Sequence, residues 1–393
     1  MPARGAWRYL TKKQPAIADI MPRFTPLAAD LPSTVPFVGP ENTERARGRS
    51  FRARLGANEN VFGPSPKAIE AMQKCAAEEA WCYGDPESFA LRDAIAEHHN
   101  VGVENVVVGE GIDGLLGTLT RLLVQPGTPV VTSLGAYPTF NFQVAACGGA
   151  LHAVPYRDWY EDPDALAAKT LETNAPLTYL VNPDNPMGTF HQPAVITKLV
   201  DQLPDDGLLC LDEAYCEFAP QDELLPIDVS NTKLIRLRTF SKAYGMAGAR
   251  MAYAIGHADL IGAFNKVRNH FGVNRIGQAG ALAALGDRDW LTHCVSQIAD
   301  ANARLADIAR DNGLAPLGSH ANFVAMDTGR DGAFSKAVVE AFAARDIFIR
   351  MPGVAPLNRH IRISAGTEHD LDIIAEAMPA VLEEADRATS SGA

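Results

Sequence analysis

The chain has 393 residues, 47% of them hydrophobic, and a formal net charge of −12. This length predicts a large core and a second, smaller unit. The acidic excess comes without a block of lysine and arginine, which argues against nucleic acid and anionic membrane as partners and favours a small molecule. The sequence contains no uninterrupted run of about eighteen apolar residues, which is the length that a membrane-spanning helix needs. We therefore expect a cytoplasmic protein.

The proline-rich first 35 residues predict an extended N-terminal arm. Further along, six short apolar runs predict strands: NVVVG, PVVTS, LTYLVN, GLLCLDE, LIRLRTF and MAYAIG, between residues 105 and 256. Apolar runs that are continuous and separated by helical stretches indicate a mostly parallel sheet buried on both faces. The fold class expected is α/β, a three-layer sandwich, with ligands bound at the carboxyl ends of the strands.

The pattern changes after residue 257 to long helical segments, followed by NFVAMD, FIRMPG, IRIS and a last helix near 368–386. This part predicts a smaller α+β domain. The domain boundaries expected are 66–285 for the large domain and 286–393 for the small one, with residues 36–65 joining the small domain.

A glycine-rich segment, VVVGEGIDGLLGTL, places Gly109, Gly111 and Gly114 where a strand turns into a helix. The G-x-G-x-x-G spacing is that of dinucleotide sites, which also need an acid about 20 residues later. No Asp or Glu occurs between Leu115 and Arg157, so a nicotinamide dehydrogenase is disfavoured. The segment still fits a phosphate held by backbone N–H groups, and a turn without a ligand stays open.

A lysine segment, RTFSKAYGMAGAR, surrounds Lys242 with Thr239, Ser241 and Arg250. A lysine among small hydroxyl residues at a strand end can enter an aldehyde pocket, and the hydroxyls and arginine suit a phosphate dianion. Each residue alone has an ordinary explanation as a solvated lysine or a strand-end hydroxyl. Only the four residues together favour a site that binds an aldehyde and a phosphate.

Two further strand ends carry polar groups. LLCLDEAYCEF places Asp212 in apolar surroundings, where a carboxylate is costly unless it meets a cation such as a protonated pyridine nitrogen. A magnesium site for an ATPase is the alternative, but no G-x-x-x-x-G-K-[ST] loop exists. In YLVNPDNPMG, the amide of Asn185 either bonds its own backbone or donates to a phenolic oxygen.

Together these segments resemble the class I/II pyridoxal-phosphate-dependent aminotransferases of fold type I, and within them the histidinol-phosphate aminotransferases. The similarity runs from about residue 36 to 367. It rests on ANENVFGPSPKAI, WCYGDPESFALRDAIA, AYPTF, NPDNPMG and TFSKAYGMAGAR. The resemblance implies pyridoxal 5'-phosphate as cofactor, bound by the large domain, and no metal.

Residue roles follow from the same resemblance. Lys242 would form the Schiff base and shuttle protons, and Asp212 would pair with the ring nitrogen. The residues that would surround the rest of the cofactor are Gly111, Ile112, Asp113, Tyr137, Asn185, Tyr215, Thr239, Ser241 and Arg250. Tyr83 would reach the phosphate from a partner subunit, which implies a homodimer with shared active sites. The substrate would contact Asn58, Phe62, Asn185, Arg350 and Arg362.

The chain departs from the family pattern at four motif positions, where it has Val61, Gly114, Asp184 and Met187. Because of these departures, the family resemblance does not determine the identity of the substrate. Histidinol phosphate is the favoured amino donor, since Arg350 and Arg362 could together meet a phosphate, and a 2-oxo acid such as 2-oxoglutarate is the acceptor. The alternatives are an aromatic or other amino acid donor, a phospho-amino-acid decarboxylase on the same fold, and a non-catalytic cofactor-binding regulator.

Overall fold

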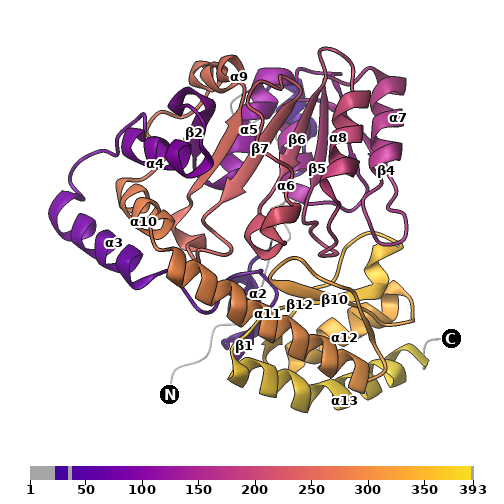
Figure 1. Ribbon diagram of the computed structural model, residues 1–393. Helices are drawn as coiled ribbons and strands as arrows, with labels where there is room; N and C mark the ends of the chain where they lie inside the picture. Colours follow the sequence, from indigo (N-terminus) through magenta and orange to yellow (C-terminus); the bar gives the residue numbers. More distant parts are fainter. Residues whose placement is uncertain (1–22, 34–37, 391–393) are drawn as a thin grey trace, which may run out of the picture. The chain divides into compact units, whose positions relative to one another are not determined.

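The computed structural model describes residues 23–33 and 38–390. Residues 35–393 form one compact unit and residues 1–34 another. The larger unit contains a seven-stranded sheet with the order β2-β8-β7-β6-β5-β3-β4, in which only β8 runs antiparallel to its neighbours (Figure 1). Its strands are β2 Val106–Gly109, β3 Pro129–Ser133, β4 Ala150–Val154, β5 Leu177–Val181, β6 Leu208–Asp212, β7 Leu234–Thr239 and β8 Ala252–Gly256. The predicted mostly parallel sheet is confirmed.

Helices cover both faces of this sheet, because successive strand residues point to opposite sides. Val130 packs with α5 and α6, whereas its neighbour Val131 packs with α7 and α8. Proline at the first position starts α6, α7 and α8, where its missing N–H costs nothing. The flanking helices are α3 Pro66–Glu79, α4 Phe89–His99, α5 Gly111–Leu123, α6 Pro138–Ala146, α7 Pro163–Thr173, α8 Pro193–Gln202, α9 Ala258–Ala263 and α10 Arg275–Leu285.

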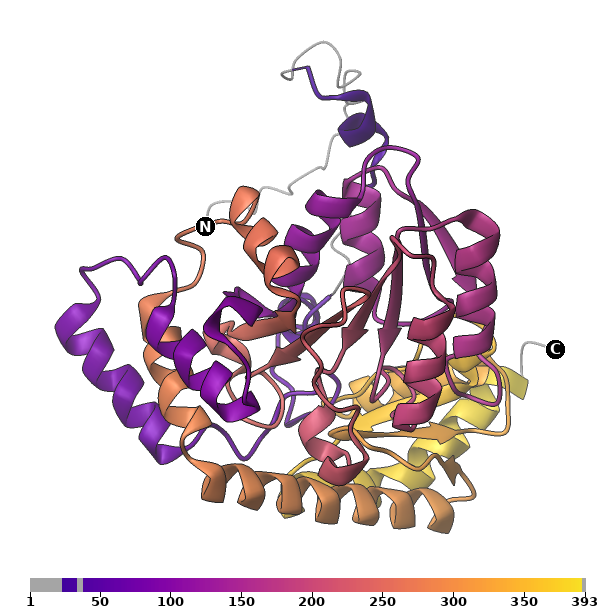
Figure 2. The same ribbon diagram turned by 45° about the horizontal axis from the view of Figure 1, so that its top comes forward.

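A further cluster of buried apolar residues, here called the second core, lies among the C-terminal elements. It includes Ala53 and Leu55 from the segment before α3, so distant parts of the chain share it. Figures 1 and 2 show its helices, in orange and yellow, beside one end of the large sheet. Its elements are α11 Arg288–Asp311, α12 Gly332–Ala344, α13 Glu368–Ser390, the sheet of β9 Ala315–Pro316, β10 Phe323–Asp327 and β12 His360–Ser364, and the pair β1 Ala53–Arg54 with β11 Ile347–Phe348.

The N-terminal segment differs from the extended arm predicted for residues 1–35. Residues 26–30 form a helix, α1 Pro26–Asp30, because the Thr25 side chain accepts a hydrogen bond from the Ala28 amide and Pro26 opens the first turn. The rest of that prediction, at residues 1–22 and 34–35, lies outside the described residues. A second short helix, α2 Pro40–Arg47, ends at Gly48 with φ 71°. In the described part of the chain, no helix has the length and apolar character needed to cross a bilayer.

Candidate active site

The strand ends bring the predicted residues to one edge of the large sheet. Tyr137 follows β3, Asn185 follows β5, Asp212 ends β6 and Thr239 ends β7. These four strands are parallel, so their carboxyl ends share one edge, which is where open α/β sheets bind ligands.

Asp212 is a buried carboxyl, 2% exposed, on the face of the sheet covered by α5 and α6. Its oxygens accept hydrogen bonds from the Tyr179 hydroxyl at 2.6 Å and the Ala214 amide at 3.0 Å. Within the described residues no basic side chain forms an ion pair with it. Burial raises the pKa of Asp212 to about 6. The site therefore presents an acid whose ionised form needs a cation.

Lys242 points into the same region from the loop after β7. Its Nζ donates to the carbonyl of Asn58 at 3.1 Å and lies 5.8 Å from the centroid of the Tyr215 ring. Burial, with the nearby cations Arg362 and Arg250, lowers the pKa of Lys242 to about 8. A lysine with such a pKa can lose its proton near neutral pH, as a nucleophile or general base requires.

Hydrogen bonds join the predicted ring and substrate residues into one network. The Tyr215 hydroxyl accepts from the side-chain amides of Asn58 at 2.9 Å and Asn185 at 3.4 Å. The guanidinium of Arg362 donates to the side-chain oxygen of Asn185. These four side chains come from four separate segments of the chain, and the fold brings them together.

The predicted phosphate group of residues surrounds the start of α5. Gly111 has φ 76°, and a Cβ there would collide with the guanidinium of Arg250. Arg250 donates to the Ser241 hydroxyl at 3.4 Å and lies 3.5 Å from a carboxylate oxygen of Asp113. The Ser241 amide donates to Thr239 Oγ1 at 3.0 Å. Helix amides, hydroxyls and a guanidinium of this kind suit a phosphate dianion, so these residues fit the phosphate of the implied cofactor.

Tyr137 lies beside this group. Its hydroxyl donates to Asp113 Oδ1 at 3.1 Å, and burial raises its pKa. The ring packs against the sheet core on the face that carries Asp212. This placement leaves the predicted stacking of Tyr137 on a cofactor ring as a prediction.

Arg362 and Arg350 supply the cationic side of the site. Arg362 is 9% exposed, and its Nε is buried without an acceptor among the described residues. The two arginines pair through their backbones at 2.7 and 3.2 Å, which places their side chains on one face. Burial and the neighbouring Arg362 lower the pKa of Arg350 to about 10. Two partly desolvated cations together favour an anionic ligand.

Two predicted residues lie apart from this network. Tyr83 is 78% exposed and contacts Phe271 at a ring-centroid distance of 4.9 Å. The side chain of Phe62 packs against the second core. The roles of both residues stay predictions.

Sequence reasoning missed several residues that shape the site. Tyr179 is buried in mid-strand and donates to Asp212, and a tyrosine inside the apolar run LTYLV was the available signal. Asn322 is fully buried and donates to the Asn58 carbonyl at 2.9 Å, beside Lys242. No sequence pattern marked Asn322, since its partner is 264 positions away.

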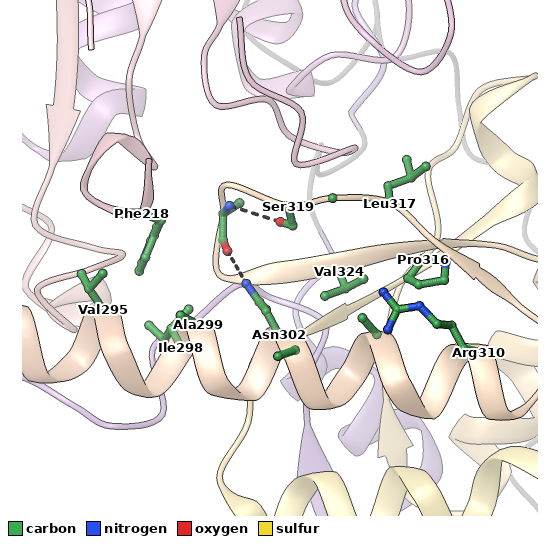
Figure 3. Close-up of a pocket in the computed structure, with 14 residues that line it drawn as sticks. Phe218, Val295, Ile298, Ala299, Asn302, Arg310, Pro316, Leu317, Ser319 and Val324 are labelled. Atoms are coloured by element: carbon green, nitrogen blue, oxygen red, sulfur yellow. Dashed lines mark hydrogen bonds between the residues drawn. The ribbon is translucent and has the colours of Figure 1, made fainter. Parts of the chain in front are cut away.

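A cavity of about 300 Å³ lies elsewhere, between α11 and the loop before β10 (Figure 3). Its wall is mostly apolar and contains none of the predicted site residues. The amide of Asn302 is used within the wall, donating to the carbonyl of Ala321 at 2.8 Å. Phe218, which contacts the Tyr215 ring, also lines it. The cavity thus adjoins the site without forming part of it.

Comparisons with known proteins agree with this geometry. The family model "Aminotransferase class I and II" matches residues 53–378. Histidinol-phosphate aminotransferase 2 of Nitrosospira multiformis is 32% identical over 84% of each chain, and the enzyme of Erythrobacter litoralis is 34% identical over 88% of this chain and 95% of its own. The crystal structure of histidinol-phosphate aminotransferase from Sinorhizobium meliloti with pyridoxal-5'-phosphate is 49% identical, with a TM-score of 0.90 over 93% of this chain and 99% of the other.

These matches confirm the predicted fold type, cofactor and enzyme class. The chain belongs to the class I and II aminotransferase family, whose members are pyridoxal-phosphate-dependent enzymes.

Proposed function

We propose that this enzyme moves the amino group of histidinol phosphate to a 2-oxo acid such as 2-oxoglutarate, in the cytoplasm, with the cofactor held on Lys242. One observation carries the proposal: Asp212, a buried acid with no ion-pair partner among the described residues, lies at the same sheet edge as a buried lysine and a buried arginine whose Nε has no acceptor there. Several similar proteins also bear the name histidinol-phosphate aminotransferase.

The cofactor, when bound, supplies an electron sink for the carbanion formed at the substrate. Asp212 would hold the ring nitrogen in its protonated state. Asn185 and Tyr215 would meet the phenolic oxygen, and Tyr137 the ring face. The phosphate would be held by the amides of Ile112 and Asp113 together with Thr239, Ser241 and Arg250.

Lys242 would then move protons. Once the amino donor has replaced Lys242 on the cofactor, the free amine of Lys242 would remove the α-proton of the donor and would later return that proton to a carbon of the cofactor. Its pKa of about 8 allows it to do so near neutral pH. The Asn58 carbonyl, which accepts from Nζ at 3.1 Å, would hold the amine close to the Tyr215 ring.

Arg362 and Arg350 would bind the anionic group of the donor. Arg362 is oriented by the carbonyl of Gly56 at 3.4 Å and by Asn185, which leaves its buried Nε for a ligand. A phosphate offers enough oxygens for both guanidinium groups, whereas a single carboxylate is met by one. This difference in charge and oxygen number favours histidinol phosphate over a neutral amino acid side chain.

A single-turnover screen of amino donors tests this assignment. We expect histidinol phosphate to convert the cofactor to its amino form faster than phenylalanine or tyrosine. Arg350→Gln should lower kcat/KM for histidinol phosphate about 100-fold and leave phenylalanine nearly unchanged, while Arg310→Gln, at an exposed arginine, serves as the control. If phenylalanine or tyrosine reacts as fast as histidinol phosphate, the donor assignment is wrong although the enzyme class stands.

We also propose a homodimer in which Tyr83 completes the partner's site. In support, Trp81, Tyr83 and Phe271 are large apolar side chains exposed by 86%, 78% and 58%. Exposed aromatic residues of this size are typical of protein interfaces. Their position at the ends of α3 and α10 would suit contact with a second copy.

Subunit mixing tests the shared site. Lys242→Ala and Tyr83→Ala should each be impaired, the second mainly through weaker cofactor binding. A hybrid dimer would contain one site with both native residues, so random mixing should restore about a quarter of wild-type sites. The measurement is activity at limiting cofactor before and after denaturation and joint refolding. Activity no higher than the mean of the two parents would contradict the shared site.

A further inference from the structure

Behind the loop that carries Asn185 lies an acidic cluster that the proposed function does not use. It consists of Glu161, which precedes α7, Asp184 in the loop after β5, and Tyr156 after β4. Glu161 and Asp184 are 1% and 2% exposed. Asp184 occupies a position where the family motif has asparagine, and here it is a buried acid.

Each carboxyl is held in place by donors. Asp184 accepts from the Tyr156 hydroxyl at 2.9 Å and from the Met187 amide at 3.0 Å. Glu161 accepts from the Val181 amide at 2.9 Å through one oxygen. Its other oxygen, Oε2, is buried and has no donor among the described residues. The side chains that face Glu161 are the carboxyl of Asp184 and the hydroxyl of Ser133.

Two carboxylates in contact cannot both be ionised in a low-dielectric interior. No lysine, arginine or histidine side chain in the described residues forms an ion pair with either. One proton between them would give the orphaned Glu161 oxygen its missing hydrogen bond and would remove the repulsion. Burial accordingly raises the pKa of Asp184 to about 7 and raises that of Glu161 as well.

The cluster is connected to the substrate site through one residue. Asp184 directly precedes Asn185, whose side-chain oxygen accepts from Arg362. Asp184 also lies within the electrostatic reach of Arg362 and Tyr215. A second negative charge on the pair would therefore weaken the positive potential that Arg362 offers to an anion.

We propose that Glu161 and Asp184 share one proton and that this carboxyl pair controls the anion affinity of Arg362, with both acids acting as positioning residues behind Asn185. The inference rests on the proposed function, since it takes Arg362 as the anion site. The groups that face the pair from the packed elements are Ser133 on β3, Tyr156 after β4, His191 beside the Glu161 carbonyl, Tyr215 after β6 and Arg362 on β12.

The sign of the effect follows from the charges. At low pH the pair carries one negative charge, and as the shared proton leaves with rising pH it carries two. The affinity for an anion should therefore fall across neutral pH. Asp184→Asn and Glu161→Gln each keep a single carboxylate that an amide can meet, so both variants should hold one charge throughout.

Sulfate is a suitable probe, because its charge is constant between pH 5.5 and 8.5. Its dissociation constant from the holoenzyme can be followed by the cofactor absorbance. We expect the wild-type constant to rise on the order of tenfold more than that of Asp184→Asn over this range. Asp164→Asn, at an exposed acid of α7, should behave as wild type. Titrations elsewhere in the site are common to all variants and cancel in the ratio.

A second readout does not depend on ligand binding. The infrared spectrum of the wild-type apoprotein at neutral pH minus that of either single variant should show a C=O band of a protonated carboxyl, because other buried acids such as Glu217 are common to all three proteins and cancel in the difference. The inference is overturned if wild type and Asp184→Asn lose sulfate affinity in parallel, or if that band is missing. Failure of the proposed function would show itself separately, as loss of cofactor binding or of turnover at pH 6, where the proton is in place.

Discussion

Lys242→Ala should abolish turnover, with a fall in kcat of at least about 10⁴-fold, and should remove the absorbance of the covalently held cofactor. The reason is geometric: Lys242 is buried, its Nζ lies 5.8 Å from the centroid of the Tyr215 ring, and this Nζ donates a hydrogen bond to the Asn58 carbonyl. The site residues described above include no second lysine. The measurement is an absorbance spectrum with added cofactor, followed by single-turnover kinetics.

Two controls separate chemistry from folding. Lys336→Ala, at an exposed lysine of α12, should leave both the spectrum and the rate unchanged. Small primary amines added to Lys242→Ala should restore part of the rate, since they can carry the proton that the missing side chain moved. An unaltered cofactor spectrum in Lys242→Ala would show that another residue holds the cofactor.

Asp212→Asn should reduce kcat about 1,000-fold while the fold is kept. The amide cannot hold a proton on the ring nitrogen, so the cofactor loses most of its power to accept electrons. The Tyr179 hydroxyl, 2.6 Å from the Asp212 carboxyl, can still donate to the amide oxygen. The measurement is kcat as a function of pH. Glu217→Gln is the matched control, because it makes the same acid-to-amide change at a buried acid outside the site network. A kcat within a factor of ten of wild type would contradict the pairing.

The same acid predicts how the apoprotein responds to pH. The folded pKa of Asp212 is about 6, above its ordinary value near 3.9, so the folded state binds the proton more tightly than the unfolded state. The free energy of unfolding contributed by this group is present at low pH and is lost as pH rises from about 4 to about 6, by roughly 3 kcal/mol. Asp212→Asn apoprotein should lack this loss, and bound cofactor should restore stability in the wild type. Denaturant unfolding at pH 4.5 and 7.5 measures both.

The sequence predicted the architecture of the large sheet because its inner strands are continuous apolar runs. It missed β4, the edge strand Ala150–Val154, in which only Val154 is buried and the other four residues are half-buried or exposed, as in a loop. The antiparallel direction of β8 was also beyond reach, since a strand buried on both faces reads alike in either direction. The helix of residues 26–30 was missed because proline was taken as a mark of extended chain rather than of a helix start.

The site residues were predictable where they follow strand ends in motifs, as Lys242, Asp212 and Asn185 do. Residues whose importance depends on a distant partner were not. Tyr179 matters only because β5 lies beside β6 and places its hydroxyl on Asp212. Glu161 matters only because the loop after β5 turns Asp184 toward it, and no local pattern reports such an encounter.

The second core has a consequence for how this enzyme can change. The groups that would hold the cofactor stand on the large sheet, whereas Arg362 and Arg350 stand on β12 and beside β11, against the second core. Substitutions in these C-terminal strands can therefore alter which donor is accepted while the machinery for proton movement stays intact. Substrate preference can therefore change during evolution through substitutions in these strands, while the residues that bind the cofactor and move protons are kept.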